Sequence, residues 1–258
     1  MKRFFVMGVL VAAFLAWVSS VWAFPVGLEG VFWDLQVSYG DDGGTIDETN
    51  DIYLIPHLPY EYTVPETKYV EVYDDDNEYF YAYASFDADA DLLSVEAYGY
   101  ADDPDESNGE WYHALARAAL GSNPFMGAPL LTLSFDWEYE LDLTDESTGR
   151  VGYAVGLIDY SETTDLNNPV FIYTETVFFD DAGFHSGHYQ HSWNIDPTHQ
   201  YIVGVGVLAE AGGTEDPDGA DVYFEISNLK ANAVPEPASI LLVGAGGLLI
   251  GLYRWRKK

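Results

Sequence analysis

The sequence predicts an all-β fold: an antiparallel β-sandwich of jelly-roll or lectin-like type with one short helix. Three observations support this fold class. Apolar and polar residues alternate over long stretches, acidic turns with glycine and proline separate these stretches, and 20 Tyr, 14 Phe and 7 Trp are enough to fill a core. Alternation with a period of two is typical of strands with one buried face, and many such strands favour two packed sheets.

The clearest predicted strand covers residues 131–143, where every odd position is apolar or aromatic and every even position is polar. Residues 79–92 alternate equally well. Their even positions are Ala, Phe and Leu, and their odd positions are Tyr, Ser and Asp. Nine further strands are expected near 31–39, 51–56, 67–73, 93–101, 151–160, 169–180, 187–195, 200–209 and 221–231.

One helix is expected after the acidic turn at 102–109. Ser107 and Glu110 have the spacing of a capping box, which satisfies free backbone N–H groups at a helix start. The apolar residues that follow recur at helical spacing as far as Gly121: Trp111, Leu115 and Ala118.

Residues 1–23 have the features of a secretory signal peptide. Lys2 and Arg3 form a positive start, an apolar run follows, and Ala23 is the small residue expected before cleavage. An uncleaved membrane anchor is the alternative, but the apolar run is short for a membrane span. We therefore expect an exported protein.

The C-terminal segment combines a Pro235-Glu236-Pro237 motif, an apolar run at 238–253 and a basic end. At about 1.5 Å per residue a helix over this run is roughly 24 Å long, which is short for a hydrocarbon core of about 30 Å. Basic residues directly after a span stay in the cytoplasm, so the rest of the chain is expected on the far side of the membrane.

The order of these parts resembles the PEP-CTERM sorting signal. The resemblance implies recognition by an exosortase in the inner membrane of a Gram-negative, polysaccharide-producing bacterium, after use of the secretion machinery. It also implies transient anchoring through the C-terminal helix, cleavage near the motif, and release or attachment at the cell surface. Proteins with this signal are typically associated with exopolysaccharide, biofilm or floc formation.

The chain therefore divides into a signal peptide at 1–23, a β-sandwich ectodomain at 24–233 and a sorting signal at 234–258. A sorting signal is an address and says little about the fold or activity of the domain that carries it.

The charge of the chain limits its partners. It has 43 acidic and 10 basic residues, a formal net charge of −33, and six of the basic residues lie in the two terminal segments. Nucleic acid is excluded, because no basic patch can replace phosphate counterions, and anionic lipid headgroups are disfavoured. Three interpretations of the acidity stay open: dispersal of a secreted protein, a saline habitat, or polysaccharide binding through bridging calcium.

Tyr79, Tyr81 and Tyr83 share one face of the 79–92 stretch and form the candidate carbohydrate site. Aromatic rings on a sheet face can stack on sugar rings while nearby carboxylates accept hydrogen bonds from hydroxyl groups. The alternative is a ladder of cross-strand aromatic pairs that stabilises the sheet.

Asp87, Asp89 and Asp91 continue the same face and form a candidate calcium site. Calcium binds several oxygen ligands, which these carboxylates could supply. The 87–98 stretch does not match an EF-hand loop, because Leu92 stands at the required glycine position. A solvated acidic face is the alternative.

His185, His188 and His191 are evenly spaced. A helix would bring them together as ligands of zinc or copper. The glycines at 183 and 187 argue against a helix, and in a strand His185 and His191 would share a face that His188 opposes.

The sequence contains no G-x-S-x-G elbow, phosphate loop or dinucleotide-binding motif, so we expect no enzyme activity. The expected function is that of a non-catalytic cell-surface or extracellular matrix protein associated with exopolysaccharide or biofilm. Two alternatives stay open. One is a calcium-assisted carbohydrate-binding module, and the other is a secreted polysaccharide-degrading enzyme on the same scaffold.

Overall fold

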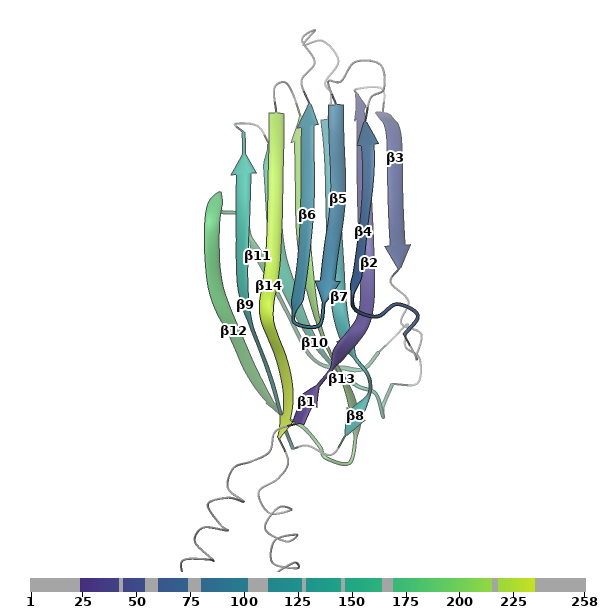
Figure 1. Cartoon of the computed structure of the whole chain (residues 1–258), viewed down its shortest axis with the longest axis vertical. Coiled ribbons are helices and arrows are strands. Elements are labelled where there is room, and N and C mark those ends of the chain that lie inside the picture. Colours follow the sequence, from purple (N-terminus) through teal and green to yellow (C-terminus); the bar gives the residue numbers. More distant parts are fainter. Residues whose placement is uncertain are drawn as a thin grey trace, which may run out of the picture.

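Two antiparallel sheets of seven strands each pack face to face in the computed structural model (Figure 1). The structure describes residues 24–41, 44–53, 60–73, 80–101, 111–126, 129–144, 147–163, 169–214 and 218–234, and the strand counts refer to these residues. The predicted all-β sandwich is confirmed.

The first sheet, called sheet A here, has the strand order β12-β9-β14-β6-β5-β4, and β1 pairs with β14. Its strands are β1 (Phe24–Val26), β4 (Glu66–Tyr73), β5 (Phe80–Asp89), β6 (Leu92–Ala101), β9 (Leu130–Leu143), β12 (Gly183–Asn194) and β14 (Asp218–Val234).

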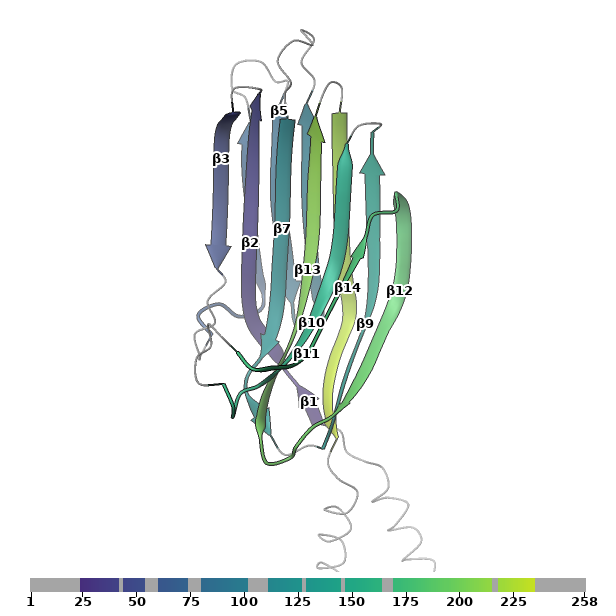
Figure 2. The ribbon, with the colours of Figure 1, turned by 180° about the vertical axis from the view of Figure 1, so that it is seen from behind.

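The second sheet, sheet B, faces the viewer in Figure 2 and has the order β11-β10-β13-β7-β2-β3, with β8 paired to β13. Its strands are β2 (Leu28–Asp41), β3 (Gly44–Tyr53), β7 (Trp111–Ser122), β8 (Phe125–Met126), β10 (Thr148–Asp159), β11 (Phe171–Phe179) and β13 (Gln200–Thr214).

The core lies between the sheets and is built by the alternation that the sequence predicts. In β9, Leu131, Leu133 and Phe135 are buried while the residues between them are partly exposed. Each apolar side chain of this size contributes about 1.5–3 kcal/mol when it is fully removed from water. The buried core residues that the structure describes run from Val26 to Ala233, so the segment from β1 to β14 contains the whole described core.

The predicted helix after residue 110 is wrong, because residues 111–122 form β7, a central strand between β2 and β13. Ser107 and Glu110 lie outside the described residues. The even positions of β7 all face the core: Tyr112, Ala114, Ala116, Ala118 and Leu120. Apolar residues are so dense here that helical and strand periods both fit the sequence. Pairing with a strand on each side overrides the helix propensity of Ala and Leu.

Two strand boundaries also differ from the expectation. The 79–92 stretch does not continue as one strand: β5 ends at Asp89, and a tight turn at Ala90 and Asp91 leads into β6. The strand expected near 51–56 begins earlier, at Gly44, and residues 54–59 lie outside the described residues.

The start of β1 and the last residues of β14 lie together at one end of the sandwich (Figure 1). The short strand β1 pairs with the end of β14, which places Phe24 opposite Ala233. The predicted signal peptide, the Pro235-Glu236-Pro237 motif and the apolar run at 238–253 lie outside the described residues. In the part that the structure describes, no helix is long and apolar enough to cross a membrane.

Replacing Gly99 with Ala is expected to destabilise the sandwich by about 1–3 kcal/mol. A Cβ atom at Gly99 of β6 would lie 2.0 Å from Cδ2 of Tyr112, a 2% exposed side chain of the opposite sheet. The measurement is the urea midpoint of unfolding of residues 24–234.

Gly206→Ala is the matched control, because its Cβ would meet its nearest neighbours, the carbonyl oxygen of Ala118 and Cβ of Ala119, at 3.4 Å. Its midpoint should stay close to that of the parent protein. Equal losses for the two variants would contradict the close packing of Gly99 against Tyr112.

Candidate functional site

The structure places Tyr81 and Tyr83 on the outer face of sheet A, half-buried among their neighbours, and Tyr79 lies outside the described residues. The alternate residues Ala82 and Ala84 are fully buried beneath them. The predicted separation of this stretch into an inner apolar face and an outer tyrosine face is therefore confirmed for the described part of β5.

Tyr98 of β6 joins these two tyrosines, and the three residues are called the tyrosine cluster here. The ring centroids of Tyr83 and Tyr98 are 5.5 Å apart with nearly parallel planes, and the Tyr81 ring lies 5.8 Å from Tyr83 and 5.9 Å from Tyr98. The Tyr81 hydroxyl donates to Oε2 of Glu71 at 3.1 Å, and the Tyr83 hydroxyl donates to Glu96. Burial raises the pKa of all three hydroxyls. The cluster thus packs as cross-strand pairs, as the structural alternative predicts.

Two further tyrosines beside the cluster are much more exposed. Tyr69 and Tyr73 of the edge strand β4 are 67% and 55% exposed, and Tyr73 is in register with Tyr81. Neither residue was among the predicted site residues. The alternation of Tyr69, Glu71 and Tyr73 was visible in the sequence, but only strand order shows that they lie at an open edge next to the cluster.

Carboxylates surround the cluster on the same face of sheet A. Across the β14–β9 pair, Asp221 lies opposite Asp142 and Glu225 lies opposite Glu138. Partial burial, followed by the charges of Glu96, Asp142 and Glu140, raises the pKa of Asp221. Like charges directly opposite each other destabilise a sheet, so this face carries electrostatic strain.

The three aspartates of the candidate calcium site are all exposed; Asp87 and Asp89 share the outer face of β5, as predicted, whereas Asp91 lies in the turn that follows. Asp87 accepts a hydrogen bond from Oγ1 of Thr67 at 3.0 Å, Asp89 accepts one from the N–H of Ala90 at 2.7 Å, and Asp91 belongs to the turn. Within the described ranges, no group of three or more His, Asp or Glu residues is placed to hold a metal ion. Calcium binding by Asp87, Asp89 and Asp91 stays a prediction.

The three histidines lie on strand β12 and are not brought together. His185 stacks on Tyr139 with a centroid distance of 4.9 Å, and His191 lies 4.7 Å from Tyr173. His188 points the other way, with Nδ1 2.6 Å from Oδ1 of Asp136. The strand arrangement is confirmed, and it separates the side chains that a zinc or copper site would need.

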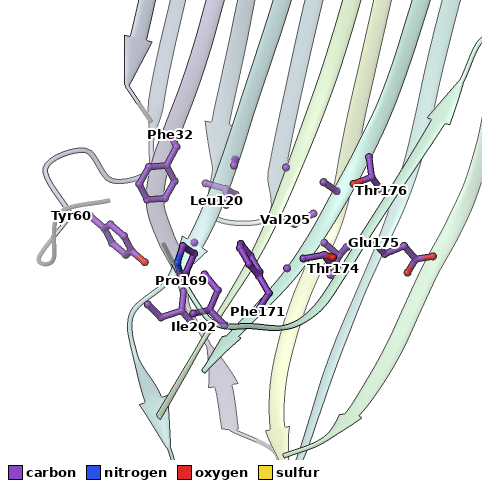
Figure 3. A pocket seen from close by; sticks show the side chains of 18 residues that line it. Phe32, Tyr60, Leu120, Pro169, Phe171, Thr174, Glu175, Thr176, Ile202 and Val205 are labelled. Carbon is purple, nitrogen blue, oxygen red and sulfur yellow. The ribbon is translucent and has the colours of Figure 1, made fainter. Parts of the chain in front are cut away.

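The structure also contains an apolar groove that sequence analysis did not predict. It lies on the outer face of sheet B and has a volume of about 520 Å³ (Figure 3). Phe32 and Tyr60 lie on one side of it and Phe171 of β11 on the other. Its floor consists of small residues of β7, β10 and β13: Ala119, Gly121, Ala154, Gly156, Gly204 and Gly206.

The wall at Tyr60 is held in place by several contacts. Its ring meets Phe32 edge-on at 5.5 Å, and its hydroxyl donates to the carbonyl oxygen of Ser122 at 2.5 Å. Burial raises the pKa of Tyr60 to about 12. A further hollow of about 350 Å³ continues the groove along the sheet toward Arg117 and Phe178. Small residues at outward positions of neighbouring strands were the signal for this groove, but the sequence does not show which strands are neighbours.

Residues 233–258 match the model of the family described as the PEP-CTERM protein-sorting motif. The resemblance of the C-terminal segment to this signal is confirmed. The motif implies processing by an exosortase, with export and a position at the cell surface. A search of curated proteins finds no match.

Three solved structures show low similarity to the chain. The adhesin domain of Epf from Streptococcus pyogenes is 12% identical over 80% of this chain and 64% of that chain, with a TM-score of 0.32. The CBM22-1 xylan-binding domain of Xyn10C from Paenibacillus barcinonensis is 8% identical over 63% and 90%, with a TM-score of 0.24. The K1 cleaved adhesin domain of Lys-gingipain from Porphyromonas gingivalis W83 is 10% identical over 64% and 98%, with a TM-score of 0.25. The chain covers less than two thirds of the Epf domain, and these scores carry no argument about ligand or function.

Asp221→Asn is expected to stabilise the sandwich by about 0.2–1 kcal/mol at neutral pH, because it removes one of two directly opposed carboxylates. The folded state raises the pKa of Asp221, so the repulsion acts above the folded pKa and is lost as the pH falls through it. Urea unfolding at pH 7 and pH 4 measures the difference.

Glu48→Gln is the matched control, because Glu48 lies opposite the neutral Ser38. It removes the same charge without relieving a like-charge pair, so it should stabilise less. Added salt should shrink the gain from Asp221→Asn. A gain that is the same at both pH values would contradict this account.

Proposed function

We propose that this chain is a non-catalytic cell-surface or matrix protein that binds neutral polysaccharide, in a lectin-like way, through an exposed tyrosine face. The tyrosine face consists of Tyr69, Tyr73 and the tyrosine cluster. The observation that carries the proposal is the pair of highly exposed rings on β4, which lie beside the cluster on the edge strand of sheet A, as far as the described strands go.

The proposed contacts follow from the residue types on the face. Tyr69 and Tyr73 lie four residues apart on one strand, which separates them by about 13 Å. Two exposed rings at this distance favour a polysaccharide chain over a single sugar. Glu71 lies between them on the same face of β4, and its carboxylate can accept hydrogen bonds from sugar hydroxyls. Behind them, the rings of the cluster pack against one another.

The charge of the face selects the kind of glycan. The cluster is bordered by Glu71, Glu96 and Asp221, so an anionic polysaccharide would be repelled unless cations bridge it. A neutral glycan is not repelled by these carboxylates. Calcium-assisted binding is the alternative proposal, and it differs in its dependence on the cation.

The non-catalytic part of the proposal is supported by the number of carboxylates in the groove, which is one among its described lining residues. Glycoside hydrolysis uses two carboxyl groups on opposite sides of the scissile bond. Among the described residues that line the groove, Glu175 is the acidic one, and it accepts a hydrogen bond from the hydroxyl of Tyr189 at 3.1 Å and one from Tyr173.

The test is co-sedimentation of residues 24–234 with neutral polysaccharides and with the producing organism's own exopolysaccharide, with calcium or with chelator. The double variant Y69A/Y73A should bind at least about tenfold more weakly, since each stacked ring contributes about 0.5–1.5 kcal/mol beyond its buried area. Its thermal unfolding should change little, because both rings are exposed.

Phe184→Ala is the matched control. Phe184 is also an exposed aromatic residue of sheet A, but it lies on β12 at the opposite edge. Its loss should leave binding unchanged. Binding that requires calcium would favour the calcium-assisted alternative, and no binding to any glycan would refute the proposal. Equal binding by Y69A/Y73A would move the site away from this face.

Processing has a separate test. The protein recovered from the cell surface should lack residues 1–23 and the chain beyond the Pro235-Glu236-Pro237 region, because the motif implies exosortase cleavage. Intact mass spectrometry measures both ends. Replacing Pro235 and Pro237 with Ala should leave the C-terminal segment attached and the protein in the inner membrane. A full-length C-terminus on the parent protein at the cell surface would contradict the prediction.

A further inference from the structure

Strand β11 is an open edge of sheet B with an unusually apolar surface. It pairs with β10 on one side, and in the described part of the chain no strand pairs with its other side (Figure 2). Phe171, Ile172 and Phe178 are 52%, 49% and 51% exposed, and Val170 just before the strand is exposed as well. An open edge offers a row of free backbone N–H and C=O groups to another strand.

Two of the other edge strands, β3 and β4, carry charged side chains that discourage such pairing, and the third, β12, is mostly polar. β3 contains Asp47, Glu48 and Asp51, and β4 contains Glu66, Lys68 and Glu71. β12 presents mainly serine, glutamine and histidine side chains, with Phe184 as its exposed large apolar residue. Charged side chains on an edge are a common protection against unwanted strand pairing, and β11 lacks it.

β11 itself has no fully exposed charged side chain, and the Arg150 guanidinium of β10, which lies 4.8 Å from the centre of the Phe178 ring, is paired with Glu210. The one charged residue of β11, Glu175, is half-buried and accepts hydrogen bonds from the hydroxyls of Tyr173 and Tyr189. With a net charge of −33, two copies of this chain repel each other over most of their surfaces. A neutral apolar edge is where two copies can approach, so the strand fits a second copy of the chain better than any basic or acidic partner.

We propose that β11 pairs antiparallel with β11 of a second copy, which joins the two B sheets into one continuous sheet. A two-fold axis at Thr174 sets Tyr173 of one copy against Glu175 of the other, in the part of β11 that follows its irregularity at Ile172. No like charges oppose each other in this register. Thr174 of one copy lies opposite Thr174 of the other. Aromatic and β-branched residues in such cross-strand positions stabilise a sheet.

Antiparallel pairing fixes the relative direction of the two copies. Both termini of the described chain lie at one end of the sandwich, where Phe24 pairs with Ala233 (Figure 1). Antiparallel β11 strands place these ends at opposite ends of the dimer. Two copies held upright on the same surface cannot pair in this way, whereas copies on facing cells or copies released into the matrix can.

This surface is separate from the tyrosine face, which lies on sheet A, so the inference goes beyond the proposed glycan binding and does not depend on it. The two edge strands also belong to different sheets, because β4 is an edge strand of sheet A and β11 is an edge strand of sheet B.

The first experiment is sedimentation velocity of residues 24–234 across micromolar concentrations and at two salt concentrations. We expect a monomer–dimer equilibrium that salt strengthens. Thr174→Glu places two carboxylates opposite each other and should weaken dimerisation at least tenfold. Asn50→Glu is the matched control, because Asn50 is an exposed residue of β3, the other edge of the same sheet. It should leave dimerisation nearly unchanged.

The second experiment tests the register. The chain has no cysteine, so Thr174→Cys introduces a single thiol. Across the proposed axis, the thiol of one copy lies opposite the thiol of the other, within reach of a disulfide bond. Mild oxidation should therefore give a covalent dimer. Asn50→Cys should stay monomeric under the same oxidation.

A parent protein that is monomeric at all concentrations and at both salt concentrations would overturn the proposal. So would a dimer that Thr174→Glu leaves intact while circular dichroism shows the variant is folded. A dimer that Thr174→Glu weakens, but that Thr174→Cys does not cross-link, would overturn the two-fold at Thr174.

Discussion

The burial of one face of each sheet against the other is the constraint on which the rest of this molecule depends. In β5, Ala82 and Ala84 fill the core because Tyr81 and Tyr83 lie at the alternate positions. A shift of one residue in register would turn the tyrosines inward and the alanines outward. Tight packing such as that of Gly99 against Tyr112 reinforces the same register. The outer faces, and every candidate site on them, follow from this inner contact.

The outer surfaces carry the acidity of the chain unevenly. Sheet A places carboxylates directly opposite each other, as in the pair of Asp221 and Asp142, and surrounds its tyrosines with negative charge. Sheet B carries an apolar groove and ends in the apolar surface of β11. Charge therefore underlies both proposals, neutral polysaccharide at the tyrosine face and a second copy of the chain at the β11 edge.

The pairing of β1 with β14 gives the sandwich a direction. It places the start and the end of the described chain together at one end of the molecule, with Phe24 opposite Ala233. The long faces of both sheets extend away from this end (Figure 1).

The sequence by itself determined the sorting motif, the fold class and most of the strands, because a motif is a local string and period-two alternation is a local pattern. It did not determine the state of residues 111–122, where dense apolar residues fit a helix and a strand equally, and pairing with β2 and β13 decided the outcome. It identified Tyr81 and Tyr83 but not the more exposed Tyr69 and Tyr73. The groove and the open edge of β11 also depended on which distant strands become neighbours. Strand order depends on the apolar surface that all strands bury together. A local sequence pattern therefore does not predict it.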